Sequence, residues 1–198
     1  MVIDAAFTSI GLNYFTSVVP HVVKFENKFV ATGQIKTIKD LSTVKLNNVE
    51  CVWKNRRSWH AAKEIAAYLH LSGLAQHLNN DKATLRHWAK NSSLEHWRDD
   101  PVGKITGVGI TTFQYLRMMG GVDTAMPDKI VRRVVKEILN SAGSNLPTTD
   151  DMDLVNTIHY MAKISGCRSI EICWMTWLIQ REGDMIRMDK YDKLLSRI

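Results

Sequence analysis

The 198-residue chain lacks the features of membrane, secreted and repetitive proteins. None of its apolar runs reaches the ~18–20 residues that a membrane-spanning helix needs, so no membrane segment is expected. The chain starts Met-Val-Ile-Asp-Ala-Ala-Phe, without the basic segment of a signal peptide, and none is expected. Only 4 Pro and 11 Gly are present, and no internal repeat or low-complexity segment is found. A globular protein is expected.

Cysteine is also scarce. Cys51, Cys167 and Cys173 are too few for a disulfide framework. No further Cys or well-spaced His completes four metal ligands around the last two, and the seven histidines show no metal-ligand spacing. We therefore expect free thiols in a reducing cytoplasm and no metal site built from side chains.

The composition fits a mildly basic protein with a sizeable core. Hydrophobic residues make up 45% of the chain, enough for one domain or two small subdomains to bury a core. The 26 Lys and Arg against 20 Asp and Glu give a net charge of +6. This excess permits an anionic partner such as nucleic acid but does not require one.

The dominant hydrophobic period is helical, which predicts an all-α fold. Amphipathic patterns cover residues 59–69, 128–139 and 152–164, while residues 170–179 are apolar nearly all round and predict a central buried helix. Strand signals are weak and limited to residues 22–25 and 29–32.

The predicted organisation has three parts. Residues 140–147 have the composition of a linker. We expect an N-terminal helical segment, 1–35, that packs on C-terminal helices, 141–198, with a central helical domain, 36–140, between them. A cleft between two helical subdomains is compatible with this division.

The most informative stretch is residues 105–133. Gly107-Val108-Gly109 predicts a tight turn between two short helices, because both glycines are free to take positive φ. Exposed N–H groups at such a turn and at the following helix N-terminus bind phosphate. Asp128 lies 17 residues after Thr111, at the expected start of another helix.

This stretch resembles the helix-hairpin-helix base-excision DNA glycosylases, the superfamily of endonuclease III and the inducible 3-methyladenine glycosylase. The resemblance rests on residues 105–112 with Tyr115 and Leu116 behind them, on Met-Pro-Asp-Lys-Ile-Val-Arg-Arg at 126–133, and on the upstream helix at 53–66. It covers about residues 40–140. It implies that Gly107, Val108, Gly109, Ile110, Thr111 and Thr112 contact duplex DNA, and that the hairpin carbonyls hold Na⁺ or K⁺.

The resemblance gives Asp128 the catalytic role. Cleavage of a glycosidic bond develops positive charge on the sugar, and a fixed carboxylate stabilises that charge and orients the attacking water. The alternative is that Asp128 after Pro127 simply begins a helix. Asp123 is a competing acid, but it lies too close to the hairpin, and we interpret it as a turn residue.

Three departures from the family pattern narrow the prediction. Bifunctional members carry a Schiff-base lysine where this chain has Thr111, which predicts hydrolysis of the base without lysine-dependent strand cleavage. The four-cysteine iron–sulfur motif is missing, so no iron–sulfur cluster is expected. Phe113 occupies a position where the family usually has the small residue Ala, and its larger side chain works against close helix packing there.

Basic and aromatic residues supply further candidates. Lys129, Arg132 and Arg133, with Lys136, form a basic stripe suited to phosphates, or alternatively a solvated helix face. A second basic group with the same two interpretations consists of Lys54, Arg56, Arg57 and Lys63. Trp53 and Trp59 are the candidate walls of a pocket for a flipped base, although most tryptophans are core residues.

These inferences predict a monofunctional DNA glycosylase that acts as a monomer on double-stranded DNA with a damaged or mismatched base. The expected location is the cytoplasm, at the nucleoid in a prokaryote. One alternative is a helix-hairpin-helix DNA-binding protein without catalysis, and another is a helical protein-interaction module. The sequence does not identify the base that is excised.

Overall fold

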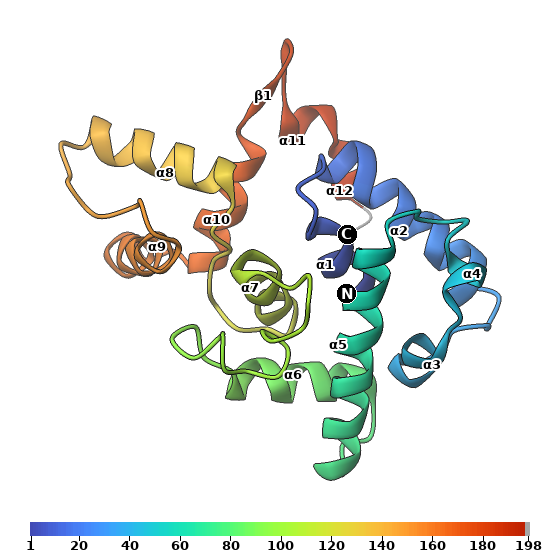
Figure 1. The fold of residues 1–198 in the computed structure, drawn as a ribbon. Coiled ribbons are helices and arrows are strands. Elements are labelled where there is room, and N and C mark those ends of the chain that lie inside the picture. The colour runs from blue at the N-terminus through green and yellow to red at the C-terminus, as the bar shows by residue number, and fades with distance from the viewer. Residues whose placement is uncertain (197–198) are drawn as a thin grey trace. The chain divides into compact units, whose positions relative to one another are not determined.

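The computed structural model describes residues 1–196 and is mostly helical, which confirms the all-α prediction (Figure 1). The chain divides into two compact units: unit 1 runs from Met1 to Val122, and unit 2 begins at Asp123. The expected linker at residues 140–147 lies inside unit 2, where it joins two of its helices. No helix in the described part of the chain is long and apolar enough to cross a bilayer.

Unit 1 is built around the 20-residue helix α5, which packs against helices α1, α3 and α6. Asn55 begins α5 by accepting a hydrogen bond from Ser58 N, and its apolar face covers the stretch 59–69 expected from the sequence. The elements of unit 1 are α1 (Val2–Thr8), η1 (Tyr14–Val18), α2 (Val19–Phe25), η2 (Glu26–Val30), α3 (Ile38–Thr43), α4 (Leu46–Val49), α5 (Arg56–Ala75), α6 (Asp81–Asn91) and α7 (Ile110–Met119).

The two weak strand signals were wrong. Residues 22–25 belong to α2, and residues 29–32 begin in the π-helical turn η2 and end in a turn. Phe25 and Phe29 are both buried, with ring centroids 5.6 Å apart, so these apolar residues face the core from consecutive helical turns. β-branched residues favour strands only weakly when tertiary packing offers a helical alternative.

Helix α7 packs closely on α6 despite the bulk of Phe113. Its side chain is fully buried and meets Trp88 edge-on, with ring centroids 5.4 Å apart. Two turns beyond, Gly120 provides the close approach instead, because a β-carbon at that position would lie 2.3 Å from Ala89 Cβ. The small residue that this packing needs is therefore present, at the end of α7.

A buried carboxyl group joins α1 to α7. Asp4 Oδ2 accepts hydrogen bonds from the hydroxyls of Tyr115 (3.0 Å) and Tyr14 (3.2 Å), while Oδ1 is buried without a hydrogen-bond partner among the described residues. Burial raises the pKa of Asp4 above its usual 3.8, against the lowering effects of the N-terminal amino group and the two tyrosines.

This raised pKa predicts a pH-dependent stability. Between pH 3.8 and the raised pKa of Asp4, the native state binds more protons than the unfolded chain, so stability falls as pH rises through this window. Asp4→Asn removes the titration. In urea unfolding from about pH 4 to about pH 7, we expect the stability of the wild type relative to Asp4→Asn to decrease as pH rises. Parallel pH profiles would contradict this assignment.

Unit 2 contains the helix pair α8 and α9, each packed on α10, followed by a short hairpin. Helices α8 and α9 match the expected stretches 128–139 and 152–164. The elements are α8 (Lys129–Ser141), α9 (Asp151–Ser165), α10 (Ser169–Leu178), β1 (Arg181–Glu182), β2 (Met185–Ile186), α11 (Arg187–Lys190) and α12 (Asp192–Leu195).

Helix α10 is less buried than its composition predicts. Cys173 and Trp177 face the core, but Met175 is 49% exposed, and Ile179 just beyond the helix is 44% exposed. The expectation of a central buried helix was therefore wrong for one of its faces. An all-apolar sequence does not by itself show how many neighbours cover a helix.

Candidate functional site

The glycine turn before α7 uses its two glycines differently. Gly107 has φ +98°, a conformation that favours glycine, whereas Gly109 has φ −103° and precedes the helix in an extended conformation. Val108 N donates to Ile105 O at 2.9 Å and closes the turn. Both glycines are free to take positive φ, and Gly107 alone of the two does so.

The chain before the turn is not a regular helix. Residues 94–106 form successive turns, held by bonds such as Asp100 N to His96 O (3.0 Å) and Lys104 N to Asp100 O (3.0 Å). The expectation of a helix on each side of Gly107-Val108-Gly109 is therefore met only after the turn. Pro101 interrupts the segment, and Gly103 approaches Trp97 so closely that a β-carbon would lie 1.7 Å from the Trp97 carbonyl oxygen.

The N-terminus of α7 offers unpaired backbone donors. Gly109 has no side chain to cap the helix, and the N–H groups of Ile110, Thr111 and Thr112 have no hydrogen-bond acceptor within residues 1–196. Gly109 is exposed and Thr111 half-buried, whereas Thr112 is only 3% exposed. The predicted contact between the Thr112 hydroxyl and DNA therefore does not agree with the burial of this residue. Val108 and Ile110 are buried and anchor the turn.

Asp128 lies in unit 2 and is the N-cap of α8. Its Oδ1 accepts a hydrogen bond from Ile130 N at 2.7 Å, and its side chain is half-buried. Oδ2 has no hydrogen-bond or ion-pair partner in the described part of the chain. Pro127 precedes the cap rather than being the first helical residue, because Asp128 itself has extended φ and ψ. One oxygen of Asp128 is thus held by the helix start and the other is available.

The basic stripe of α8 is partly engaged within unit 2. Arg132 donates to the carbonyl oxygens of Thr148 and Thr149 and forms an ion pair with Asp151, so it fixes the loop between α8 and α9. Arg133 donates to Gln180 Oε1. Lys129 and Lys136 are exposed without such partners in the described residues. The sequence allowed either phosphate contact or a solvated helix face for this stripe, and these two lysines are its members without such partners.

The competing acid Asp123 has a structural role. Its two carboxylate oxygens accept hydrogen bonds from Ser169 N (3.2 Å) and Ile170 N (3.0 Å) at the start of α10. A carboxylate at this position satisfies N–H groups that the helix leaves unpaired.

Trp53 and Trp59 belong to the core of unit 1. Trp53 is 5% and Trp59 0% exposed, and Phe7 stacks on Trp53 with ring centroids 4.6 Å apart. Trp59 Nε1 donates to Trp53 O at 2.7 Å, and its ring meets Phe7 edge-on. The suggestion that these rings wall a base pocket does not agree with this burial. The structure gives both rings a packing role instead.

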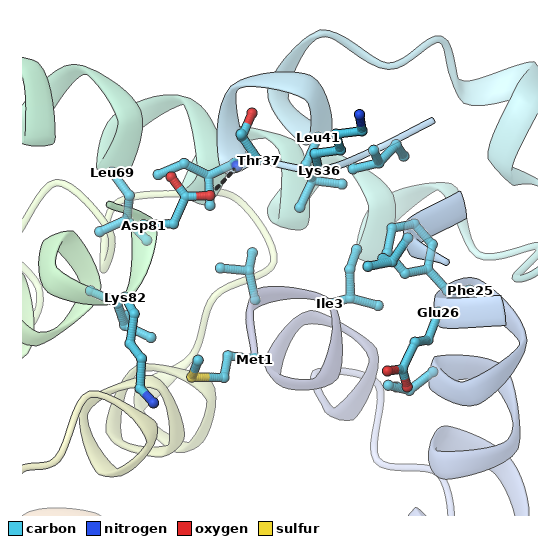
Figure 2. A pocket seen from close by; sticks show the side chains of 16 residues that line it. Met1, Ile3, Phe25, Glu26, Lys36, Thr37, Leu41, Leu69, Asp81 and Lys82 are labelled. Carbon is cyan, nitrogen blue, oxygen red and sulfur yellow. Dashed lines mark hydrogen bonds between the residues drawn. The ribbon is translucent and has the colours of Figure 1, made fainter. Parts of the chain in front are cut away.

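Two cavities lie away from these residues. One in unit 1 measures about 470 Å³ and has Lys82 and Met1 on one side and Phe25 and Glu26 on the other (Figure 2). The other, in unit 2, measures about 660 Å³ and is lined by apolar side chains of α8, α9 and α10 that include Ile164 and Met175. None of the predicted site residues lines either cavity.

The cysteines are free, and the described residues contain no metal-binding cluster of three or more His, Cys, Asp or Glu side chains. Burial raises the pKa of Cys173 to about 12, which keeps this thiol protonated.

The candidate residues fall into two separate groups. The glycine turn with its free N–H groups belongs to unit 1, and Asp128 with Lys129 belongs to unit 2. Residues 122–128, between these groups in the sequence, have no regular secondary structure. In the comparisons with known proteins, no family model, no curated protein and no solved structure matches the chain.

Proposed function

We propose that the protein is a monofunctional DNA glycosylase that hydrolyses the N-glycosidic bond of a damaged or mismatched base in duplex DNA. The observation that carries this proposal is the half-buried Asp128, held by Ile130 N through one oxygen while the other oxygen has no partner among the described residues. The glycine turn at Gly107 supports the DNA-binding half of the proposal.

The turn suits a phosphate group of the duplex. The free N–H groups of Ile110 and Thr111 carry partial positive charge, and the exposed Gly109 leaves room for a phosphate to approach the backbone. Such contacts fix the position of the duplex and carry little sequence information. The base itself is then selected after it leaves the helical stack.

Asp128 suits the hydrolytic step. As the bond between C1′ and the base nitrogen breaks, the base leaves with the bonding electrons, and positive charge develops on the sugar. The Asp128 carboxylate stabilises this charge and orients a water molecule, whose oxygen bonds to C1′ and whose proton is released. Thr111 provides no amine, so no imine forms at that position and the DNA strand stays intact.

Base release from a panel of lesion duplexes tests the proposal. The panel contains uracil and thymine opposite guanine, alkylated purines and oxidised guanine, and strand breaks are scored with and without hot alkali. We expect breaks on at least one substrate only after alkali treatment, and no borohydride-trapped protein–DNA complex.

Three other outcomes would contradict the proposal in different ways. Breaks without alkali would indicate a lyase. Salt-dependent duplex binding without base release would favour the non-catalytic DNA-binding alternative, and absence of both would favour a protein-interaction module.

A further inference from the structure

Arg57 lies directly against the glycine turn. It is in the first turn of α5, and a β-carbon placed on Gly107 would lie 3.3 Å from both Cγ and Nε of Arg57. The same β-carbon would lie 3.7 Å from Ala61 Cβ, one turn further along α5. The absence of a side chain at Gly107 therefore lets α5 hold the Arg57 side chain beside the turn.

The positive charge of Arg57 lies at the N-terminus of α5, where it destabilises the helix. The first turn of α5 contains no acidic residue, and a helix N-terminus disfavours a cation. The neighbouring Arg56 is neutralised, because its Nε forms an ion pair with Glu50 Oε1 at 2.6 Å. Arg57 is exposed and has no carboxylate partner among residues 1–196. Functional sites are among the places where proteins break such local rules.

We propose that Arg57 is a DNA-contacting residue that binds a phosphodiester of the duplex beside the glycine turn. This inference rests on the proposed function and adds a contact from α5 to the backbone donors of α7. A guanidinium suits the task because its N–H groups match two phosphate oxygens. The bound phosphate supplies the negative charge that the first turn of α5 lacks.

The test compares two adjacent arginines. Arg57→Gln and the matched control Arg56→Gln are titrated with a fluorescent lesion-free duplex at salt concentrations from about 50 to 200 mM. For Arg57→Gln we expect about tenfold weaker binding at low salt and a salt slope reduced by about 0.9, the value for one phosphate contact. Arg56→Gln should keep the wild-type slope.

Thermal unfolding separates a binding role from a structural one. Because the helix N-terminus disfavours the charge, Arg57→Gln should unfold at the wild-type temperature or above it. If Arg57→Gln keeps the wild-type affinity and salt slope, or if its unfolding temperature falls, the proposed role of Arg57 is wrong. In either case, duplex binding by the wild-type protein would still support the DNA-binding proposal. A wild-type protein that binds no duplex would overturn both.

Discussion

Asp128→Asn is expected to lower base release by about 10²–10³-fold, the usual cost of losing one group that stabilises charge in a transition state. The substitution removes the negative charge and keeps the shape. Asparagine is as good an N-cap as aspartate, so its side-chain oxygen retains the hydrogen bond from Ile130 N and α8 keeps its start. We therefore expect wild-type duplex affinity and a free energy of unfolding changed by no more than a few tenths of a kcal/mol.

The chain offers a matched control for this variant. Asp150 is the N-cap of α9 in the same unit, and its Oδ1 accepts from Met152 N at 2.7 Å, the same geometry as at Asp128. Single-turnover base release by wild type, Asp128→Asn and Asp150→Asn is compared on the best substrate of the lesion panel. Equal rates of base release for wild type and Asp128→Asn would show that Asp128 only caps α8. A loss of base release in Asp150→Asn as large as that in Asp128→Asn would show the same.

The local parts of the site could be predicted from the sequence. Hydrophobic period gave α5, α8 and α9 because each helix buries one stripe of its own residues. The turn at Gly107 was visible because positive φ selects glycine, and the start of α8 was visible because Asp after Pro is a local helix signal. These features depend on neighbours within a few residues.

The features that the sequence did not predict depend on contacts between residues far apart in the chain. Arg132 was a candidate phosphate ligand on the polar face of α8. Its partners are instead backbone carbonyl oxygens and the carboxylate of Asp151, 16 to 19 residues further along the chain. The irregular segment before the turn contains a close approach of Gly103 to Trp97, which no periodicity indicates. The position of Arg57 beside Gly107 likewise requires the packing of α5, although its basic group was visible in the sequence.

Trp59→Ala is expected to cost unit 1 about 3–5 kcal/mol of unfolding free energy, the range for deleting a large buried aromatic side chain. Trp59 is fully buried among Phe7, Phe25 and Trp53, and it donates to the Trp53 carbonyl oxygen. Its loss leaves a cavity and an unsatisfied buried acceptor. The milder Trp59→Phe keeps most of the ring and loses the donor, for an expected cost of about 1–3 kcal/mol.

Urea unfolding measures both variants, with Leu71→Ala as the control because Leu71 lies on the same helix and is 64% exposed. The control should unfold close to wild type. The order expected from a core role is Trp59→Ala least stable, then Trp59→Phe, then Leu71→Ala. A Trp59→Ala variant with wild-type stability but weakened base release would instead restore Trp59 as a wall of the base pocket. Stability measured before activity therefore decides between the packing role and the base-binding role of this ring.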